Sequence, residues 1–191
     1  AKELELQNKN IDVIWNGYTI TGSRDKQVEF TKPYLTNEQM LVVRSDSDIR
    51  TKADLSDRIV GTQLDSAAES LINADADFSA SLKEVRAYDD YQEALIDLKS
   101  SDRIDAVAVD IVLINYVMQQ EPGVYRVLSE SLGEEYFGIG CRKGSVALRE
   151  AIDGALDAMQ EDGTAEEISG KWFGVNIVVR DVPKLTRADL S

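Results

Sequence analysis

Several residue types that usually carry chemistry are absent or scarce in this chain of 191 residues. There is no histidine, which excludes Ser-His-Asp and Cys-His catalysis and removes most zinc sites together with the commonest general base at neutral pH. The single cysteine, Cys141, cannot form an internal disulfide, and its apolar neighbours predict a small buried side chain rather than a reactive thiol. We therefore expect a non-catalytic protein without a metal site or a cofactor.

Long apolar runs and an excess of basic charge are also missing. No stretch approaches about 18 continuous apolar residues, so no membrane span is predicted, and the chain does not open on a signal-peptide pattern. Against 35 Asp and Glu there are only 21 Lys and Arg, which gives a net charge of −14. This balance argues against nucleic acid or an anionic membrane surface as a partner.

What the sequence does contain is an alternation of strand and helix patterns, which predicts an α/β fold. Residues 59–64 and 104–109 read as strands, and the second is apolar enough to be central and parallel. Residues 83–86 indicate a short edge strand. After it, Asp89 is predicted to cap a helix.

The C-terminal part of the sequence predicts two further helices. The first opens after Gly144-Ser145, with Leu148, Ile152, Ala155, Leu156 and Met159 on one face. The second begins with a capping box at residues 164–167. We expect Ile168 and Trp172 of this second helix to pack inward.

Residues 11–34, IDVIWNGYTITGSRDKQVEFTKPY, hold the strongest candidate for a binding site. Gly17 lets a ligand approach the backbone, Thr19 supplies a neutral hydroxyl, and Arg24 supplies a planar fork suited to a carboxylate. These residue types predict an anion site. The alternative is a turn followed by a solvated surface arginine.

Two later positions have the same double interpretation. Ser66 opens a capping box at the start of a helix, where the free backbone amides of Ala67 and Ala68 favour an anion. Asp110 ends the apolar strand at the sheet edge where α/β proteins bind ligands. For each of the two side chains, the residues alone favour the alternative, a helix N-cap with no ligand.

The order of residues in the 11–34 segment resembles the amino-acid-binding proteins of ABC transporters, in solute-binding protein family 3. The likeness continues to Trp172-Phe173-Gly174. It implies that Gly17, Thr19 and Arg24 bind the ligand α-carboxylate. The resemblance also implies that Gln63, Ser66 and Ala67 are additional ligand contacts. It further implies that Asp110, the last residue of the family pattern Asp-Ala-x-x-x-Asp, binds the ligand ammonium. Asp65 departs from the family, which has glycine there.

The resemblance also implies a two-lobe clamshell of the type II periplasmic-binding-protein kind. Residues 39–138 form one lobe, residues 1–38 and 139–175 form the other, and residues 176–191 are a tail. Family members carry a strand, a helix and a second strand before this point, so we expect the first lobe to be incomplete. An incomplete lobe predicts weak or no ligand binding and possible self-association of this chain.

The implied function is that of an extracellular solute-binding component, a periplasmic protein or a cell-surface lipoprotein. It would bind a free polar amino acid between the lobes and deliver it to permease subunits. Two alternatives stay open: a ligand-sensing domain of a receptor or kinase, and a dehydratase-like enzyme on the same fold. The sequence does not reveal which amino acid is bound.

Overall fold

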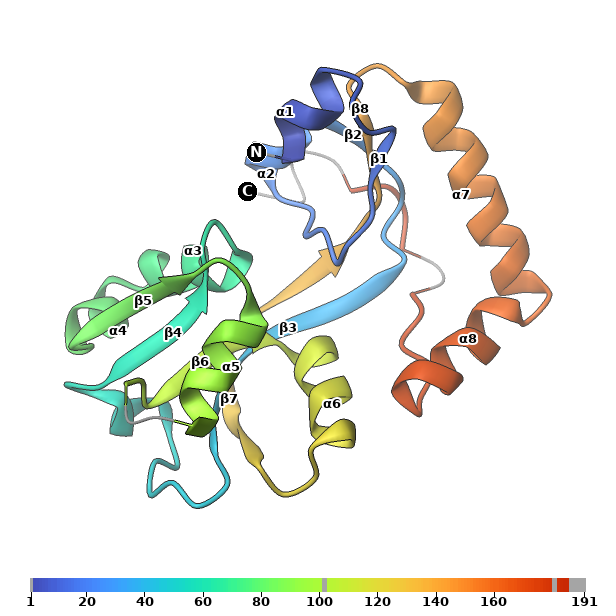
Figure 1. Cartoon of the computed structure of the whole chain (residues 1–191). Helices are drawn as coiled ribbons and strands as arrows, with labels where there is room; N and C mark the ends of the chain where they lie inside the picture. The colour runs from blue at the N-terminus through green and yellow to red at the C-terminus, as the bar shows by residue number, and fades with distance from the viewer. Residues whose placement is uncertain (1, 101–102, 180–181, 186–191) are drawn as a thin grey trace. The chain divides into compact units, whose positions relative to one another are not determined.

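The computed structural model describes residues 2–100, 103–179 and 182–185, and the chain divides into two compact units (Figure 1). Unit 1 comprises Ala1–Thr36 and Glu135–Ser191, and unit 2 comprises Asn37–Glu134. The chain passes from one unit to the other within two strands. These are β3 (Leu35–Arg44) and β7 (Tyr125–Phe137).

Unit 2 is built on a five-stranded sheet with the order β5-β4-β6-β3-β7. Its other strands are β4 (Ile59–Gln63), β5 (Glu84–Tyr88) and β6 (Ala106–Asp110). β4 pairs in parallel with both β5 and β6, whereas β3 runs antiparallel to β6. The predicted α/β class is confirmed, with β6 as the central strand and β5 as the edge strand. The sheet is mixed because β3 is antiparallel.

The alternation of side chains along β6 explains its unbroken apolar run. Ala106 and Ala108 belong to one hydrophobic cluster, and Val107 and Val109 belong to another. Successive side chains of a strand point to opposite faces, so a strand that is covered on both faces has no position for a polar residue. All four side chains are fully buried. The first polar residue is Asp110, where the strand ends.

Helices cover both faces of this sheet. Ile72 and Phe78 pack into the cluster of Ala106, and Leu95 and Ile114 pack into that of Val107. The elements that supply this cover and the neighbouring turn are η1 (Lys52–Leu55), α3 (Ala67–Ala74), α4 (Ala76–Ser81), α5 (Tyr91–Ser100) and α6 (Ile111–Gln120).

The cap of α5 differs from the prediction by one residue. Asp90, not Asp89, accepts a hydrogen bond from the Glu93 N–H, at 2.9 Å. Two consecutive aspartates offer the same capping chemistry, and only the backbone geometry decides between them.

Unit 1 contains a three-stranded antiparallel sheet with the order β1-β8-β2. Its elements are α1 (Lys2–Gln7), β1 (Val13–Ile14), α2 (Gly22–Asp25), β2 (Val28–Phe30) and β8 (Gly140–Arg142), and its core includes Leu6, Ile14, Tyr18, Ile20, Val28 and Phe30. Cys141 is fully buried in β8, as predicted, and burial raises the pKa of its thiol. A raised pKa disfavours the reactive thiolate.

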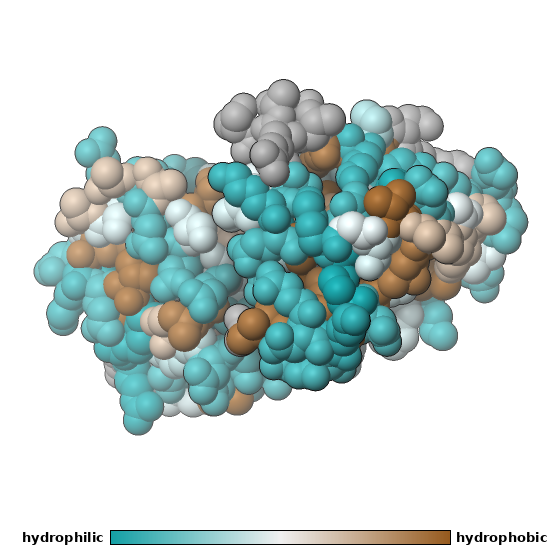
Figure 2. All heavy atoms as spheres, turned by 90° about the horizontal axis from the view of Figure 1, so that it is seen from above, coloured by the Kyte–Doolittle hydropathy of each residue, from teal (hydrophilic) through white to brown (hydrophobic). Residues whose placement is uncertain are grey.

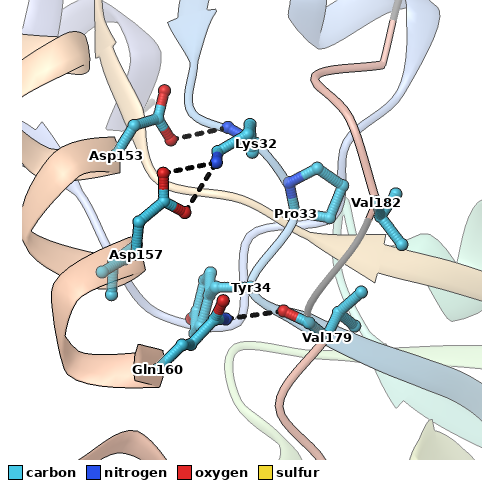
Figure 3. Close-up of a pocket in the computed structure, with 9 residues that line it drawn as sticks. Lys32, Pro33, Tyr34, Asp153, Asp157, Gln160, Val179 and Val182 are labelled. Atoms are coloured by element: carbon cyan, nitrogen blue, oxygen red, sulfur yellow. Dashed lines mark hydrogen bonds and ion pairs between the residues drawn. The ribbon is translucent and has the colours of Figure 1, made fainter. Parts of the chain in front are cut away.

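Polar contacts fix the long helix α7 (Val146–Glu161). The structure describes all of this helix, and Asp153 is its one buried residue. The Asp153 carboxylate accepts hydrogen bonds from the Lys32 N–H at 2.9 Å and from Arg149 at 3.2 Å. The Lys32 ammonium also lies 2.6 Å from both carboxylate oxygens of Asp157, one turn further along (Figure 3). The predicted apolar stripe is partly or fully exposed.

Helix α8 (Thr164–Phe173) corrects two predictions. Its N-cap is Gly163, with a left-handed φ of 86°. The Thr164 N–H donates to the Asp162 carboxylate at 2.9 Å, so the capping box predicted at residues 164–167 does not form. Ile168 and Trp172 are 45% and 51% exposed instead of packing inward. Their spacing identifies one face of the helix, but spacing cannot reveal whether another element covers that face.

Hydrophilic residues dominate the surface in Figure 2, with apolar residues scattered among them. Among the residues that the structure describes, no helix has the length and apolar character needed to cross a membrane. Within the same residues, no group of three or more His, Cys, Asp or Glu side chains could hold a metal ion. The acidic composition is thus not explained by a cation site in the described part of the chain.

The Glu29 carboxylate offers a test of how charge stabilises unit 1. Its Oε1 lies 2.6 Å from the Lys184 ammonium, and this hydrogen bond lowers the pKa of the carboxyl, although burial acts in the opposite direction. A lowered folded-state pKa stabilises the fold above the ordinary value of 4.5, and this contribution is lost as the pH falls through the folded-state value. We expect Glu29→Gln to lower the unfolding free energy by about 1–2 kcal/mol at pH 7.

Urea denaturation followed by circular dichroism, from pH 7 downward, measures this effect. The difference between Glu29→Gln and the unsubstituted chain should shrink as the pH falls below 4.5. Glu150→Gln is the control, because the Glu150 side chain is 63% exposed. A loss of stability that does not change with pH would contradict the assignment to the ionised carboxylate.

Candidate functional site

Gly17 shapes the turn that follows β1. Its φ is +67°, in the left-handed region, and an added Cβ would lie 3.4 Å from the Phe137 ring. Backbone hydrogen bonds then pair residues 18–20 with residues 136–138, and Thr19 is bridged to Phe137. Thr19 is 6% exposed. Backbone pairing within unit 1 thus holds this segment in place.

The guanidinium of Arg24 rests against the same segment. The helix that carries it begins at Thr21, whose hydroxyl accepts the Arg24 N–H at 3.2 Å. The Arg24 Cζ lies 4.8 Å from the centroid of the Tyr18 ring, and Nη1 donates to the Thr19 carbonyl at 3.1 Å. An aromatic face and a carbonyl both attract a cation, so these groups set the direction of the fork. The structure therefore brings Gly17, Thr19 and Arg24 together.

An aromatic pair borders the Gly17 turn. Trp15 is 55% exposed, and its ring lies edge-on to Tyr34, with 6.1 Å between centroids and an interplanar angle of 81°. Burial raises the pKa of the Tyr34 hydroxyl, and hydrogen bonds from the Trp15 side chain and the Gly17 backbone oppose that rise. Tyr34 thus contacts Trp15 through its ring, and its backbone N–H donates to the Phe137 carbonyl beside the turn. Local sequence spacing did not reveal this support.

In unit 2, the Ser66 side chain caps α3. Its hydroxyl accepts the Glu69 N–H at 3.1 Å and lies 3.3 Å from the Thr62 hydroxyl. Thr62 donates its one hydroxyl proton to the Ala108 carbonyl, 3.0 Å away, so Ser66 must be the donor between the two hydroxyls. A hydrogen bond from Ser66 to a ligand therefore requires its hydroxyl to rotate. The N–H of Ala67, in the first turn, has no acceptor within its own helix.

Asp65 stands where the family resemblance leads us to expect glycine, and its backbone is glycine-like. Its φ is +57°. Aspartate tolerates this region better than most residues with a side chain. The Asp65 N–H also donates to the Glu69 carboxylate at 2.7 Å, one residue before the position of a standard capping box. The left-handed backbone before α3 is thus present without a glycine.

Gln63 ends β4 at the start of the same turn. Its side-chain amide donates to the Asp89 carbonyl at 3.1 Å, which ties it to the chain that follows β5. Contact with a ligand through this nitrogen would compete with that hydrogen bond. The role of Gln63 in ligand binding stays a prediction.

Asp110 occupies the N-cap position of α6, yet its side chain makes no capping hydrogen bond. Its Oδ1 instead accepts hydrogen bonds from the side-chain amides of Asn37, at 2.7 Å, and Gln39, at 2.8 Å. The amide oxygen of Asn37 accepts the Val112 N–H at 3.4 Å and so contacts the first turn of the helix in place of Asp110. A simple helix cap, the alternative left open by the sequence, does not describe this carboxylate.

Sequence reasoning missed the two amides that orient Asp110. Both amides belong to β3, which begins at Leu35. Asn37 and Gln39 are 3% and 1% exposed. Alternate residues of a strand share a face, so two amides separated by one residue are the signal that could have found them.

Comparison with known proteins gives a context to the residues around Arg24 and to those around Asp110. Residues 2–175 match the bacterial extracellular solute-binding proteins, family 3. The ABC transporter arginine-binding protein 1 of Escherichia coli is 34% identical over 172 residues, which cover 88% of this chain and 68% of that protein. The glutamate-binding protein GluB of Corynebacterium glutamicum is 32% identical over 196 residues, covering 100% of this chain and 64% of that protein.

A solved structure shows the same fold. An ABC uptake transporter substrate-binding protein from Streptococcus pneumoniae, with bound histidine, is similar with a TM-score of 0.88 and 37% identity over 94% of this chain and 74% of that chain. The fold is therefore that of the solute-binding proteins. The chain belongs to the bacterial extracellular solute-binding proteins, family 3, as the resemblance implied, and spans 68% and 64% of the two curated relatives above.

Two substitutions at residue 65 test the left-handed backbone before α3. Asp65→Gly and Asp65→Ala both remove the side chain, so the difference between them isolates the backbone. We expect the glycine variant to be about 1 kcal/mol more stable, because a Cβ is unfavourable at a φ of +57°. Urea denaturation of the two variants measures the difference.

Asp77, within α4, is the matched control for this comparison. At position 77 the glycine variant should be less stable than the alanine variant, because glycine weakens a helix. Equal stability of the two variants at position 65 would contradict the strained conformation.

Proposed function

We propose that this protein binds a free polar amino acid and delivers it to an ABC permease at the cell surface. The observation that carries the proposal is a pair of oriented, oppositely charged groups: Arg24 against the Thr19 carbonyl in unit 1, and Asp110 against two buried amides in unit 2. The relatives are named for arginine and glutamate, and the solved structure holds histidine. All three are α-amino acids, which carry one carboxylate and one ammonium on the same carbon.

The ligand carboxylate is assigned to Arg24, with Gly17 and Thr19 beside it. The guanidinium fork can donate two parallel hydrogen bonds to the two oxygens of a carboxylate. Gly17 allows a ligand to approach the backbone closely, because this residue is exposed and has no side chain. The start of α3 completes the assignment with the amide of Ala67 and, after rotation, the hydroxyl of Ser66, since a helix N-terminus favours an anion.

The ligand ammonium is assigned to Asp110, and Gln63 is proposed to contact the ligand near the start of α3. A hydrogen bond that involves a charged group contributes about 1.5–3 kcal/mol. A few such bonds, reduced by the cost of ordering, correspond to micromolar binding, roughly −8 kcal/mol. Binding in this range needs both half-sites.

We identify the two units with the two ligand-binding lobes. Because each unit supplies the counter-charge for one end of a zwitterion, the ligand favours an arrangement in which both units contact it. A permease that recognises this arrangement would then receive the amino acid. The family supports an extracellular or periplasmic location, and we propose a lipid anchor where the protein is not periplasmic.

Binding without turnover is part of the proposal. The sequence holds no histidine to act as a general base, and the two relatives described above are named as binding proteins. Incubation with prephenate-like acids followed by product analysis tests this part separately. Formation of a product would favour a dehydratase-like enzyme.

Removal of either charge tests the assignment of the site. Calorimetric titration with the twenty amino acids identifies the ligand. Arg24→Ala and Asp110→Asn should then each weaken binding of that ligand about 10- to 100-fold, the loss expected for one charged hydrogen bond. If the chain alone binds too weakly, the same substitutions are measured after the N-terminal strands and helix of the family are restored.

Lys26→Ala and Asp77→Asn are matched controls, because each removes one charge from an exposed position near or within a short helix. Both should bind as the unsubstituted protein does. Binding that survives Arg24→Ala or Asp110→Asn unchanged would exclude the proposed site.

A further inference from the structure

A C-terminal strap, residues 175–179 and 182–185, follows α8 within unit 1. Ser169, which is 3% exposed, fixes the start of the strap. Its hydroxyl donates to the Val175 carbonyl at 2.9 Å and accepts the Ile177 N–H at 2.9 Å. The strap is thus attached from its first residue.

The middle of the strap is held from two sides. The Val179 N–H donates to the Tyr34 carbonyl at 3.0 Å, and a β-bridge pairs Val178 with Leu35. On the other side, the Gln160 side-chain amide donates to the Val179 carbonyl at 2.6 Å (Figure 3). One peptide segment is therefore clamped between α7 and the residues that begin β3.

The far end of the strap returns to the core of unit 1. The Lys184 ammonium lies 2.6 Å from Glu29, whose side chain is 14% exposed. Leu185 packs against the hydrophobic cluster that contains Tyr18 and Ile20. The strap is therefore anchored beyond the clamp as well as before it.

Tyr34 connects the clamp to the carboxylate half-site. Its backbone carbonyl accepts the hydrogen bond from Val179, and its ring lies edge-on to Trp15. Its N–H donates to the carbonyl of Phe137 at 3.0 Å, and Phe137 is bridged to Thr19 and lies beside Gly17. Contacts thus run without a break from Gln160 to Val179, from Val179 to Tyr34, and from Tyr34 to the Gly17 turn.

We propose that the strap is a positioning element for ligand binding: Gln160 holds Val179, Val179 holds Tyr34, and Tyr34 fixes the Gly17 turn that receives the ligand carboxylate. This inference rests on the proposed function for the role of Gly17. The family match ends at residue 175, so nearly all of the strap lies beyond the part of the chain that defines the family. The strap therefore adds support to a binding loop that the family motif supplies.

Amide hydrogen exchange, measured by NMR on the full chain without ligand, tests the connection. Gln160→Ala removes the hydrogen bond to the Val179 carbonyl. We expect the Val179 and Tyr34 amides to exchange about five-fold faster, as for the loss of one hydrogen bond, with the Ile20 amide unchanged. The Tyr34 N–H donates to the Phe137 carbonyl and so reports on the link from Tyr34 to the Gly17 turn. The Ile20 N–H bonds to the Tyr136 carbonyl, outside the proposed connection, so it reports on the stability of unit 1.

Two further variants make the result decisive. Glu161→Ala, on the exposed neighbour of Gln160, should leave all three amides unchanged. Val179→Pro removes the N–H that bonds to the Tyr34 carbonyl and should speed exchange of the Tyr34 amide at least as much as Gln160→Ala does.

Three outcomes would overturn the proposal. They are faster exchange at the Val179 amide without faster exchange at the Tyr34 amide, equal acceleration of all three amides, and no change of exchange in either Gln160→Ala or Val179→Pro. Because the measurement uses no ligand, its outcome is independent of whether Arg24 and Asp110 bind an amino acid.

Discussion

The two charged side chains that we propose to bind the ligand, Arg24 and Asp110, are each held in a fixed direction by neighbouring groups. Arg24 lies over the Tyr18 ring and donates to the Thr19 carbonyl, while Asp110 accepts hydrogen bonds from Asn37 and Gln39. These four partners are neutral. Such partners orient the charged side chain, and an oriented group loses less entropy when it binds.

The sheet of unit 2 explains how Asp110 can be held this way. Helices cover both faces of β6, so polar groups are excluded until the strand ends at Asp110. The neighbouring strand β3 runs antiparallel, and its residue Gln39 lies directly opposite Asp110. The strand that carries the chain from unit 1 to unit 2 thus also brings the amides of Asn37 and Gln39 to the carboxylate.

The sequence predicted what depends on local pattern and missed what depends on distant contacts. The apolar run before Asp110 and the order of residues around Arg24 were enough to indicate the sheet and the family. The same reasoning placed Trp172 inward, because helical spacing shows a face but not its cover. Sequence patterns also did not reveal the hydrogen bond between Gln160 and Val179 or the one between Val179 and Tyr34. The partners in each of these pairs do not belong to the same helix or strand.

Affinity and selectivity have different physical origins in such a site. The carboxylate and the ammonium are common to all α-amino acids, so Arg24 and Asp110 cannot distinguish arginine from glutamate, the ligands named for two relatives. The strap acts on the Gly17 turn, which is assigned to the carboxylate. A loosened strap should therefore weaken binding of every amino acid by a similar factor and leave their order of preference unchanged. Selectivity must come from groups that face the ligand side chain. The proposed connection through Tyr34 leads to the Gly17 turn instead.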